Sequence, residues 1–140
     1  MILCLFVMVL CLSNTLSVVK TTTSDEEGII CRRCGRDICV TSDLMSIASE
    51  LSISQRNITY QITNIQFDSQ FDSHTISNKL TNITLLVQLF TNPDGFSFEL
   101  ICSRKASCVV HGKPVQKASW FPGYTWQPIS CAQCGAHIGW

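Results

Sequence analysis

Alternating apolar and polar positions dominate the middle of the chain. Residues 58–63 read Ile-Thr-Tyr-Gln-Ile-Thr, and this period of two predicts a half-buried β-strand. Two further runs rich in β-forming residues, 83–90 and 96–103, flank the sequence Asn-Pro-Asp-Gly at 92–95. Because proline fixes φ at a turn and glycine can adopt a positive φ, we expect these runs to pair as a β-hairpin.

Shorter units of the same kind follow towards the C-terminus. A β-forming run at 108–111 ends at a glycine, and a Pro-Gly turn separates the β-forming aromatic runs 119–121 and 124–126. Residues 44–51 carry apolar side chains at helical spacing and predict one short helical turn. Short strands, no long helix and no internal repeat indicate an all-β fold in one small domain.

The N-terminus differs in character from the rest. Residues 1–19 contain no charged side chain, and 2–12 form an apolar run about half as long as the roughly 20 residues of a membrane-spanning helix. We therefore expect a signal peptide at 1–17, a flexible leader at 18–28 and a folded domain at 29–140. The protein is then secreted and keeps no stable membrane span after the signal is removed. A membrane anchor is the alternative.

Two sequons fit a secreted protein. Asn57-Ile-Thr and Asn82-Ile-Thr are acceptor sequences for N-linked glycans, and both lie in polar stretches expected to face water. Unglycosylated surface asparagines are an equally good interpretation of these triplets alone.

Charge and cysteine content narrow the function. The 140 residues hold ten basic and ten acidic side chains and no basic block, so nucleic-acid binding is not expected. Nine cysteines in so short a chain point instead to metal or covalent cross-links, because a domain of this size has a modest core.

Four of the cysteines have the spacing of a metal site. Cys31 and Cys34, and likewise Cys131 and Cys134, form a Cys-x-x-Cys-Gly motif. Two intervening residues let both sulfurs of a motif point to one side, and the glycine permits the tight turn. We expect a tetrahedral, structural Zn²⁺ with no open position for catalysis. Disulfides, which a secretory compartment favours, are the alternative.

The other cysteines of the expected mature chain carry less information. Cys102 and Cys108 flank a short loop and form a disulfide if their strands approach closely enough. Cys39 is then left over. The sequence leaves this pairing open.

All three tryptophans lie close to the C-terminus. The last 21 residues contain Trp120, Trp126 and Trp140, and the second Cys-x-x-Cys-Gly motif lies between Trp126 and Trp140. Indole faces set against one another can enclose a small ring, an alkyl group or a cation. Packing in the core is the alternative, since tryptophan is usually well buried.

Read together, these motifs resemble one family. In chain order they are Cys-x-x-Cys-Gly at 31–35, Asn-Pro-x-Gly at 92–95, Ser-Trp-Phe-Pro-Gly-Tyr-x-Trp at 119–126 and Cys-x-x-Cys-Gly-x-His-Ile-Gly-Trp at 131–140. This order is similar to the CULT domain, the cereblon-type thalidomide-binding zinc domain. The resemblance implies a β-tent, two antiparallel sheets joined near one end by a Cys4 zinc. It implies binding of glutarimide, succinimide and related cyclic imides, without a reaction.

The resemblance also assigns site residues. Trp120, Trp126 and Trp140 match the three walls of the imide pocket, and Asn92 matches a polar residue over its mouth. Backbone groups of Ala118 and Trp120 are implied to hold the imide of a small ligand or of a peptide that ends in a cyclic imide. The family has histidine at the position of Ala118, so a side-chain contact is lost while the backbone contact is kept.

Other departures limit what is carried over. The stretch before Asn92 is longer than is usual in the family, and it holds both sequons. Family members also continue beyond the position of Trp140 with a further aromatic residue, so we expect an incomplete pocket rim. The Lon-like and helical regions that connect cereblon to a ubiquitin ligase have no counterpart here, and association with a ubiquitin ligase is not expected.

Two enzymatic functions agree less well with the sequence. A methionine-sulfoxide reductase shares the tent-like fold, but its Arg-x-Cys-x-Asn string is absent, and no cysteine follows Cys134. The histidines His74, His111 and His137 are scattered without paired carboxylates, which disfavours a hydrolase. We therefore do not expect an enzyme. A secreted structural or peptide-interaction module remains the main alternative.

Overall fold

The computed structural model describes residues 8–11, 16–20, 27–67 and 76–140, and the surroundings of side chains within 27–61 and 82–140. These residues form β-strands and one turn of 3-10 helix, η1 (Thr41–Asp43), and they contain no α-helix. The prediction of an all-β fold is confirmed. A helix that could span a membrane is not found among the described residues.

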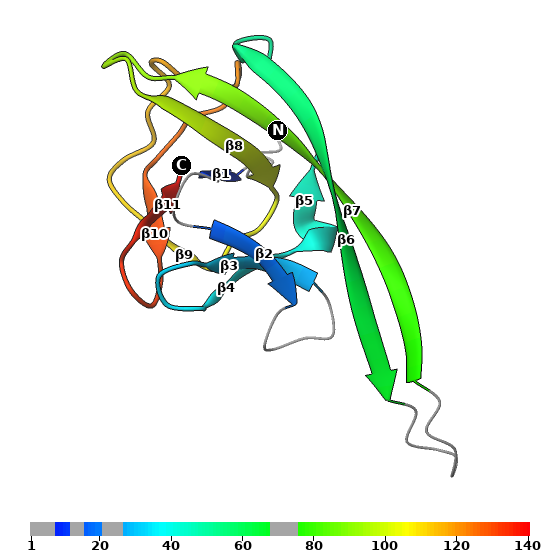
Figure 1. Ribbon diagram of the computed structural model, residues 1–140. Coiled ribbons are helices and arrows are strands. Elements are labelled where there is room, and N and C mark those ends of the chain that lie inside the picture. The colour runs from blue at the N-terminus through cyan, green and yellow to red at the C-terminus, as the bar shows by residue number, and fades with distance from the viewer. Residues whose placement is uncertain (1–7, 12–15, 21–26, 68–75) are drawn as a thin grey trace, which may run out of the picture.

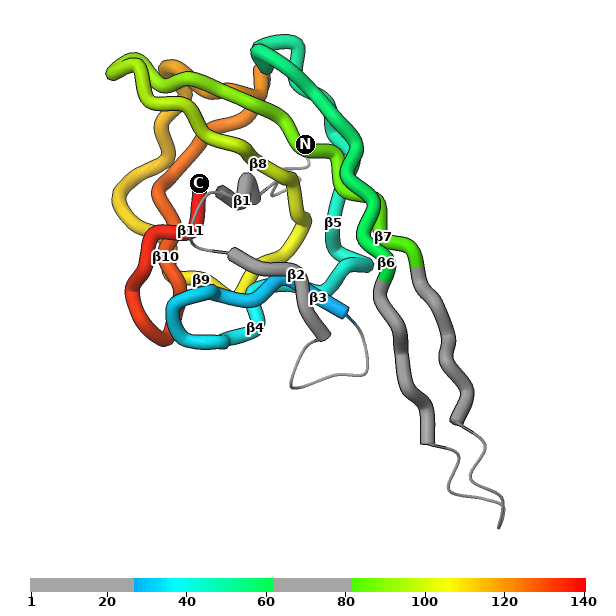
Figure 2. The backbone as a smooth tube through the Cα atoms, viewed as in Figure 1, coloured from blue at the N-terminus to red at the C-terminus, as the bar shows by residue number. Residues whose placement is uncertain are grey.

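The strands form two antiparallel sheets (Figure 1). The small sheet has the order β2 (Leu16–Lys20), β3 (Glu27–Cys31) and β4 (Asp37–Val40). The large sheet has the order β6 (Ser54–Phe67), β7 (Ile76–Thr91), β8 (Ser97–Ser103), β1 (Met8–Cys11), β11 (His137–Gly139), β10 (Ile129–Cys131) and β9 (Cys108–Val110), and β5 (Leu44–Met45) also pairs with β8. The large sheet curls so that β9 and β10 lie beside β3 and β4 (Figures 1 and 2).

The predicted hairpin is formed by β7 and β8. Phe90 and Phe98 lie opposite each other across it. At its turn the amide of Gly95, which has a φ of 87°, donates to the carbonyl of Asn92 over 2.9 Å. The Asn92 side chain also accepts a bond from the amide of Phe96 over 2.8 Å. These contacts fix the end of the hairpin on which Asn92 lies.

The predicted strand at 58–63 belongs to β6, which pairs with β7 along its whole length, from Ser54 to Phe67. The two strands leave the body as a long ribbon (Figure 1). Thr59 lies opposite Thr84, and their hydroxyls are 3.1 Å apart. Because side chains alternate along a strand, Asn57 and Asn82 lie on the same exposed face of the ribbon as these threonines.

The buried side chains form two clusters that share β8. Ile101 packs in a cluster with residues of β3, β7, β10 and β11. Leu100 and Cys102 belong to a second cluster with Phe90 and Phe121. Because successive side chains of a strand point to opposite faces, β8 is covered on both sides and joins the two clusters.

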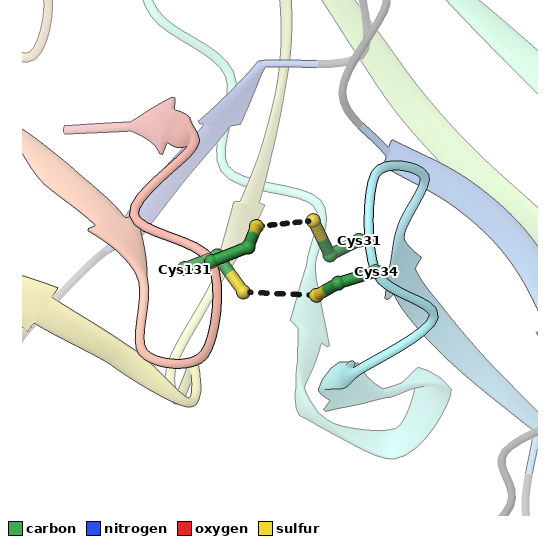
Figure 3. Close-up of side chains that lie close together, drawn as sticks. Cys31, Cys34 and Cys131 are labelled. Carbon is green, nitrogen blue, oxygen red and sulfur yellow. Dashed lines mark hydrogen bonds between the residues drawn. The ribbon is translucent and has the colours of Figure 1, made fainter.

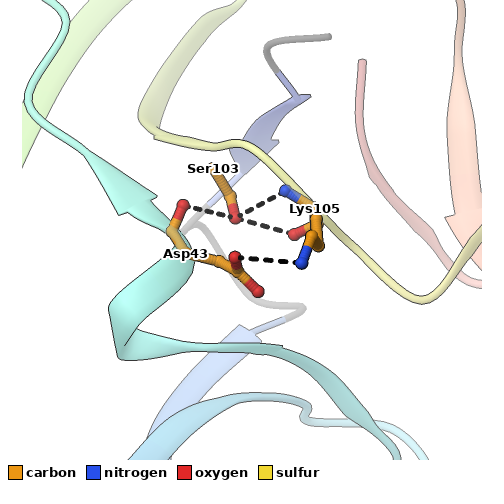
Figure 4. A network of polar contacts seen from close by, with 3 residues as sticks. All are labelled: Asp43, Ser103 and Lys105. Carbon is orange, nitrogen blue, oxygen red and sulfur yellow. Dashed lines mark hydrogen bonds and ion pairs between the residues drawn. The ribbon is translucent and has the colours of Figure 1, made fainter.

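Polar contacts attach η1 and β5 to the end of β8 (Figure 4). The Ser103 hydroxyl lies 3.2 Å from the carbonyl of Asp43 and 2.7 Å from that of Lys105. The amide of Arg104 donates to the Asp43 carbonyl over 2.9 Å, and Lys105 Nζ lies 3.9 Å from the Asp43 carboxylate. The segment before β6 is therefore held against the large sheet.

Two local predictions are wrong. Residues 44–51 contain no helical turn, because Leu44 and Met45 form β5 and pair with Ser103 and Cys102 of β8. The aromatic runs 119–121 and 124–126 are not strands, and the one bridge there joins Val115 to Trp126. The first segment forms a strand because β8 offers unpaired backbone groups with which it can bond. The second segment is not a strand because the Pro-Gly turn and its side-chain hydrogen bonds fix another conformation.

Part of the N-terminal region is paired in this structure. β1 and the first two residues of β2 lie within the predicted signal peptide, and β3 begins at Glu27 inside the predicted leader. β1 pairs with both β8 and β11. Removal of the signal and the domain boundaries stay predictions.

Candidate functional site: a four-cysteine cluster and an aromatic pocket

Two hairpins of the same build carry the four cysteines. β3 ends at Cys31 and β4 begins at Asp37, while β10 ends at Cys131 and β11 begins at His137. In each loop the glycine amide donates to the carbonyl of the first cysteine, over 2.8 Å in the first and 3.0 Å in the second. Gly35 and Gly135 have φ values of 74° and 70°, which residues with a side chain rarely adopt.

The two hairpins are a local repeat. Residues 29–38 and 129–138 both read Ile-x-Cys-x-x-Cys-Gly-x-x-Ile, and the isoleucines of both are buried. Each hairpin also has a register shift beside its first isoleucine. The expectation of no internal repeat is wrong at this scale, because the repeat is short and its copies lie far apart in the chain.

The four sulfurs converge between the hairpins (Figure 3). Cys31 Sγ lies 3.7 Å from Cys134 Sγ, and Cys34 Sγ lies 3.6 Å from Cys131 Sγ. All four lie within 4.8 Å of one another. Zinc–sulfur bonds of about 2.3 Å in a tetrahedron place sulfurs about 3.8 Å apart, so the cluster has the dimensions of a Cys4 zinc site.

The backbone around the cluster favours thiolates. Burial opposes ionisation of Cys131, but hydrogen bonds from the backbone of Cys134 and Gln133, with contacts to neighbouring thiols, lower its pKa to about 7. A backbone hydrogen bond at Arg36 favours the thiolate of Cys34, yet burial and the three other thiols raise its pKa to about 12. Four thiolates so close together repel one another. A dication between the sulfurs would offset this repulsion and favour the deprotonated form of all four cysteines.

The donor set therefore fits Zn²⁺. Cys31, Cys34, Cys131 and Cys134 would hold the ion and fill all four positions of a tetrahedron, which leaves none for water or substrate. Cys31 ends a strand of the small sheet and Cys131 ends a strand of the large one. The ion would supply a cross-link between the two sheets.

The three other cysteines between residues 27 and 140 have little thiolate character. Burial is the main cause that raises the pKa of Cys39 to about 11 and that of Cys102 to about 12, and it also raises the pKa of Cys108. No disulfide joins Cys102 to Cys108, a pairing that the sequence left open. These thiols are poor nucleophiles near neutral pH.

A pocket of about 280 Å³ brings together all five residues implied as the ligand site. Asn92 lies on the turn between β7 and β8, and Trp140 directly follows β11. Ala118, Trp120 and Trp126 belong to the long loop between β9 and β10. The rest of the lining comes from the same turn and loop: Pro93, Asp94, Ser119, Phe121, Tyr124 and Thr125.

The indoles are held in different ways. The ring centroids of Trp120 and Trp140 are 5.1 Å apart, and the two rings are nearly perpendicular at 81°. Trp126 Nε1 donates to the carbonyl of Lys117 over 2.9 Å, and its backbone pairs with Val115. Each ring is thus fixed, and none of the three is fully buried.

Phenylalanines support two of these rings. Phe90 stacks on Trp120 with a centroid distance of 5.2 Å, and Phe98 meets Trp140 edge-on at 5.1 Å. Sequence reasoning missed both residues. The signal was present, because a hairpin closed at 92–95 places positions 90 and 98 opposite each other.

Two residues at the pocket, Ala118 in its lining and His137 beside Trp140, have an unusual conformation or environment. Ala118 has a φ of 57°, which is disfavoured by about 1–2 kcal/mol for a residue with a Cβ. Backbone strain of this kind occurs where a loop is shaped around a ligand. The His137 ring lies 4.6 Å from that of Trp140, and burial, together with the charge of His111, lowers the pKa of His137.

Comparison with known proteins finds similarity to cereblons. Protein cereblon of Drosophila melanogaster is 26% identical over 131 residues, which are 91% of this chain and 17% of that protein. Protein cereblon of Gallus gallus and that of Danio rerio are each 35% identical over 69 residues, which are 47% of this chain. The chain spans only 16 to 17% of the length of these relatives. No protein-family model matches the chain, and no solved structure matches it significantly.

Three observations agree with one another. The similarity to cereblon extends over most of the chain. The fold consists of two antiparallel sheets, and four cysteines from both sheets converge with zinc-site dimensions. The chain is similar to the cereblon-type CULT domain over most of its length, and its four converging cysteines could hold a stabilising zinc ion.

Proposed function

We propose that this domain binds cyclic imides, such as glutarimide and thalidomide-like compounds, in the pocket between Trp120, Trp126 and Trp140, and that it catalyses no reaction. The observation that carries the proposal is the single cavity that joins these indoles to Asn92 and to the backbone at Ala118. Zn²⁺ at the four cysteines has a structural role.

The size of the cavity suits a small flat ring. Its volume of about 280 Å³ lies just below the roughly 300–1,000 Å³ of sites for drug-sized ligands. Five of the eleven lining residues are aromatic, and their faces favour contact with a flat ring that carries no formal charge. A five- or six-membered imide has these properties, and its edge carries one donor between two acceptors.

Backbone groups are available for that edge. In the part of the chain that the structure describes, the Trp120 carbonyl is taken by the Ser49 hydroxyl, while no hydrogen bond is found for the Trp120 amide or the Ala118 carbonyl. One backbone donor and one acceptor next to each other complement an imide carbonyl and N–H. Ala118 contributes through its backbone, so the absence of histidine at this position does not remove these bonds.

A thiol-dependent reaction is disfavoured on chemical grounds. Burial raises the pKa of Cys39 and Cys102 well above neutrality. The four thiols that lie close to one another would serve as metal ligands. This supports a binding domain over a reductase. The expectation that the domain does not join a ubiquitin ligase stays a prediction, since the match covers 16 to 17% of the cereblons.

We also propose that the protein is secreted. The apolar run near the N-terminus supports this, and Asn57 and Asn82 are exposed on one face of the ribbon, where glycans would not collide with the body. Cleavage after residue 17 would remove β1 and expose the facing edges of β8 and β11. In the mature domain the backbone groups of these edges would then bond to water, to each other or to another strand.

Titration with glutarimide should quench or shift the indole fluorescence with saturation. Trp120→Ala should abolish the response, because it removes one wall of the pocket. The domain should still fold, because the zinc cluster and the rest of the hydrophobic core are unchanged. N-methylglutarimide should bind at least about tenfold more weakly, since it lacks the donor that the backbone recognises. No response to millimolar glutarimide, or equal binding of the methylated ring, would contradict the proposal.

Asp94 is the one charged residue in the described lining, so it should select the group attached to the imide. A glutarimide with an ammonium substituent should bind about 2- to 5-fold more tightly than one with a carboxylate, because the rim is exposed. Asp94→Asn and 1 M salt should each remove the difference, whereas Glu50→Gln, exposed and outside the pocket, should retain it. Calorimetric titration measures it, and a preference unaffected by Asp94→Asn argues against this role.

Metal analysis should find one zinc ion per chain. A strong chelator should abolish the near-ultraviolet circular dichroism of the tryptophans, because structural zinc contributes about 10–16 kcal/mol to folding in small domains. Cys34→Ser should lower zinc content, while Cys108→Ser should leave it unchanged. Full zinc content in Cys34→Ser, or a chelated protein with an unchanged spectrum, would argue against a structural Cys4 site.

Expression with its own N-terminus in a secretory eukaryotic cell should release the protein into the medium. After deglycosylation, intact mass should show loss of about the first 17 residues. Asn57→Gln and Asn82→Gln should each remove one glycan. Recovery of the protein inside the cell, with residue 1 retained and no glycan, would refute secretion.

A further inference from the structure

The segment between β5 and β6 contacts the pocket from behind. Ser49 is 2% exposed, and its hydroxyl donates a hydrogen bond to the carbonyl of Trp120. These residues are far apart in the chain and come from different elements. Ser49 thus attaches the backbone of a pocket wall to the interior of the domain.

Gln88 of β7 holds Ser49 in place. Its carboxamide oxygen accepts a bond from the amide of Ser49 over 2.7 Å, and its nitrogen donates to the carbonyl of Ile47 over 2.8 Å. Gln88 is 1% exposed. A buried amide is costly unless its groups are bonded, and here both ends are used.

The position of Gln88 in β7 explains why a polar residue lies there. The neighbouring side chain on the same face is Phe90, which stacks on Trp120. One face of β7 therefore contacts the ring of Trp120 through Phe90 and reaches its carbonyl through Gln88 and Ser49. An apolar residue at position 88 would fill space but would leave segment 47–49 without these bonds.

We propose that Ser49 and Gln88 are positioning residues of the ligand pocket. By holding the Trp120 carbonyl on the inner side, they turn the Trp120 amide and ring towards the ligand. The inference rests on the proposed imide-binding function for its effect on affinity. Its effect on the conformation of Trp120 is independent of any ligand.

The hydrogen bond also contributes to selectivity. With its carbonyl engaged by Ser49, Trp120 offers only a donor to the pocket, and the acceptor comes from Ala118. Release of the Trp120 carbonyl would add a second acceptor and disturb the match with an imide edge. The loss should therefore be larger for glutarimide than for an apolar ring of the same size, such as cyclohexane.

The test uses the zinc-loaded full chain with 5-fluorotryptophan. Fluorine NMR without ligand should give one resonance for Trp120 in the unaltered protein, assigned with Trp120→Phe. Ser49→Ala should broaden or split that resonance and leave those of Trp126 and Trp140 sharp. Ser49→Ala should also weaken glutarimide binding about 5- to 10-fold, the effect of one buried hydrogen bond.

Two further variants separate positioning from general destabilisation. Ser52→Ala removes a hydroxyl that donates to the carbonyl of Ser49 but does not touch Trp120, so the Trp120 resonance should stay single. Gln88→Met keeps the volume of the side chain and loses both hydrogen bonds of the carboxamide, so it should reproduce the effect of Ser49→Ala. If Gln88→Met does not fold, Ser49→Ala decides, because it leaves the bond from the Ser49 amide to Gln88 intact.

The outcomes distinguish this inference from the proposed function. A sharp, unshifted Trp120 resonance in folded Ser49→Ala, or the same change in Ser52→Ala, overturns the positioning role. Absence of glutarimide binding by the unaltered protein overturns the imide proposal, while the fluorine spectra still test the positioning of Trp120. Equal affinity of the unaltered protein and Ser49→Ala contradicts the predicted effect on binding.

Discussion

The convergence of four thiols is the constraint on which the rest of the structure depends. β9, β10 and β11 have three residues each, too few for ladder hydrogen bonds alone to fix them. Their position is set where Cys131 and Cys134 meet Cys31 and Cys34 at 3.6–3.7 Å. A dication held by these sulfurs would relieve the repulsion between them and would join the two sheets at their ends.

The pocket depends on this cross-link through short connections. Trp140 follows β11 directly, and the loop that carries Trp120 and Trp126 enters β10. On the other side, Phe90 and Phe98 of the hairpin support the rings, and Ser49 and Gln88 hold the backbone of Trp120. The pocket lining thus comes from the turn at 92–94, the loop at 118–126 and Trp140, and the four-cysteine cluster and the shared strand β8 hold these parts together.

Sequence alone predicted features with local signals. Spacing identified the four cysteines that converge, alternation identified β6, and the Asn-Pro-Asp-Gly turn identified the β7–β8 hairpin. Ser49 and Gln88 were missed because their partners are long-range and their types are unremarkable in a polar stretch. β5 was misassigned because pairing with β8 overrode a weak helical spacing. The repeat at 29–38 and 129–138 is present in the sequence, but it is only ten residues long and its two copies lie far apart in the chain.

One measurement tests the central claim that a zinc-joined pair of hairpins holds three indoles around a site for a flat imide. It is a crystal structure of the metal-loaded domain with glutarimide, with data collected on both sides of the zinc absorption edge. The account predicts one anomalous peak within about 2.3 Å of four sulfurs and ring density between Trp120, Trp126 and Trp140. Cysteines paired as disulfides, or a space between the indoles filled by the protein's own side chains, would contradict it.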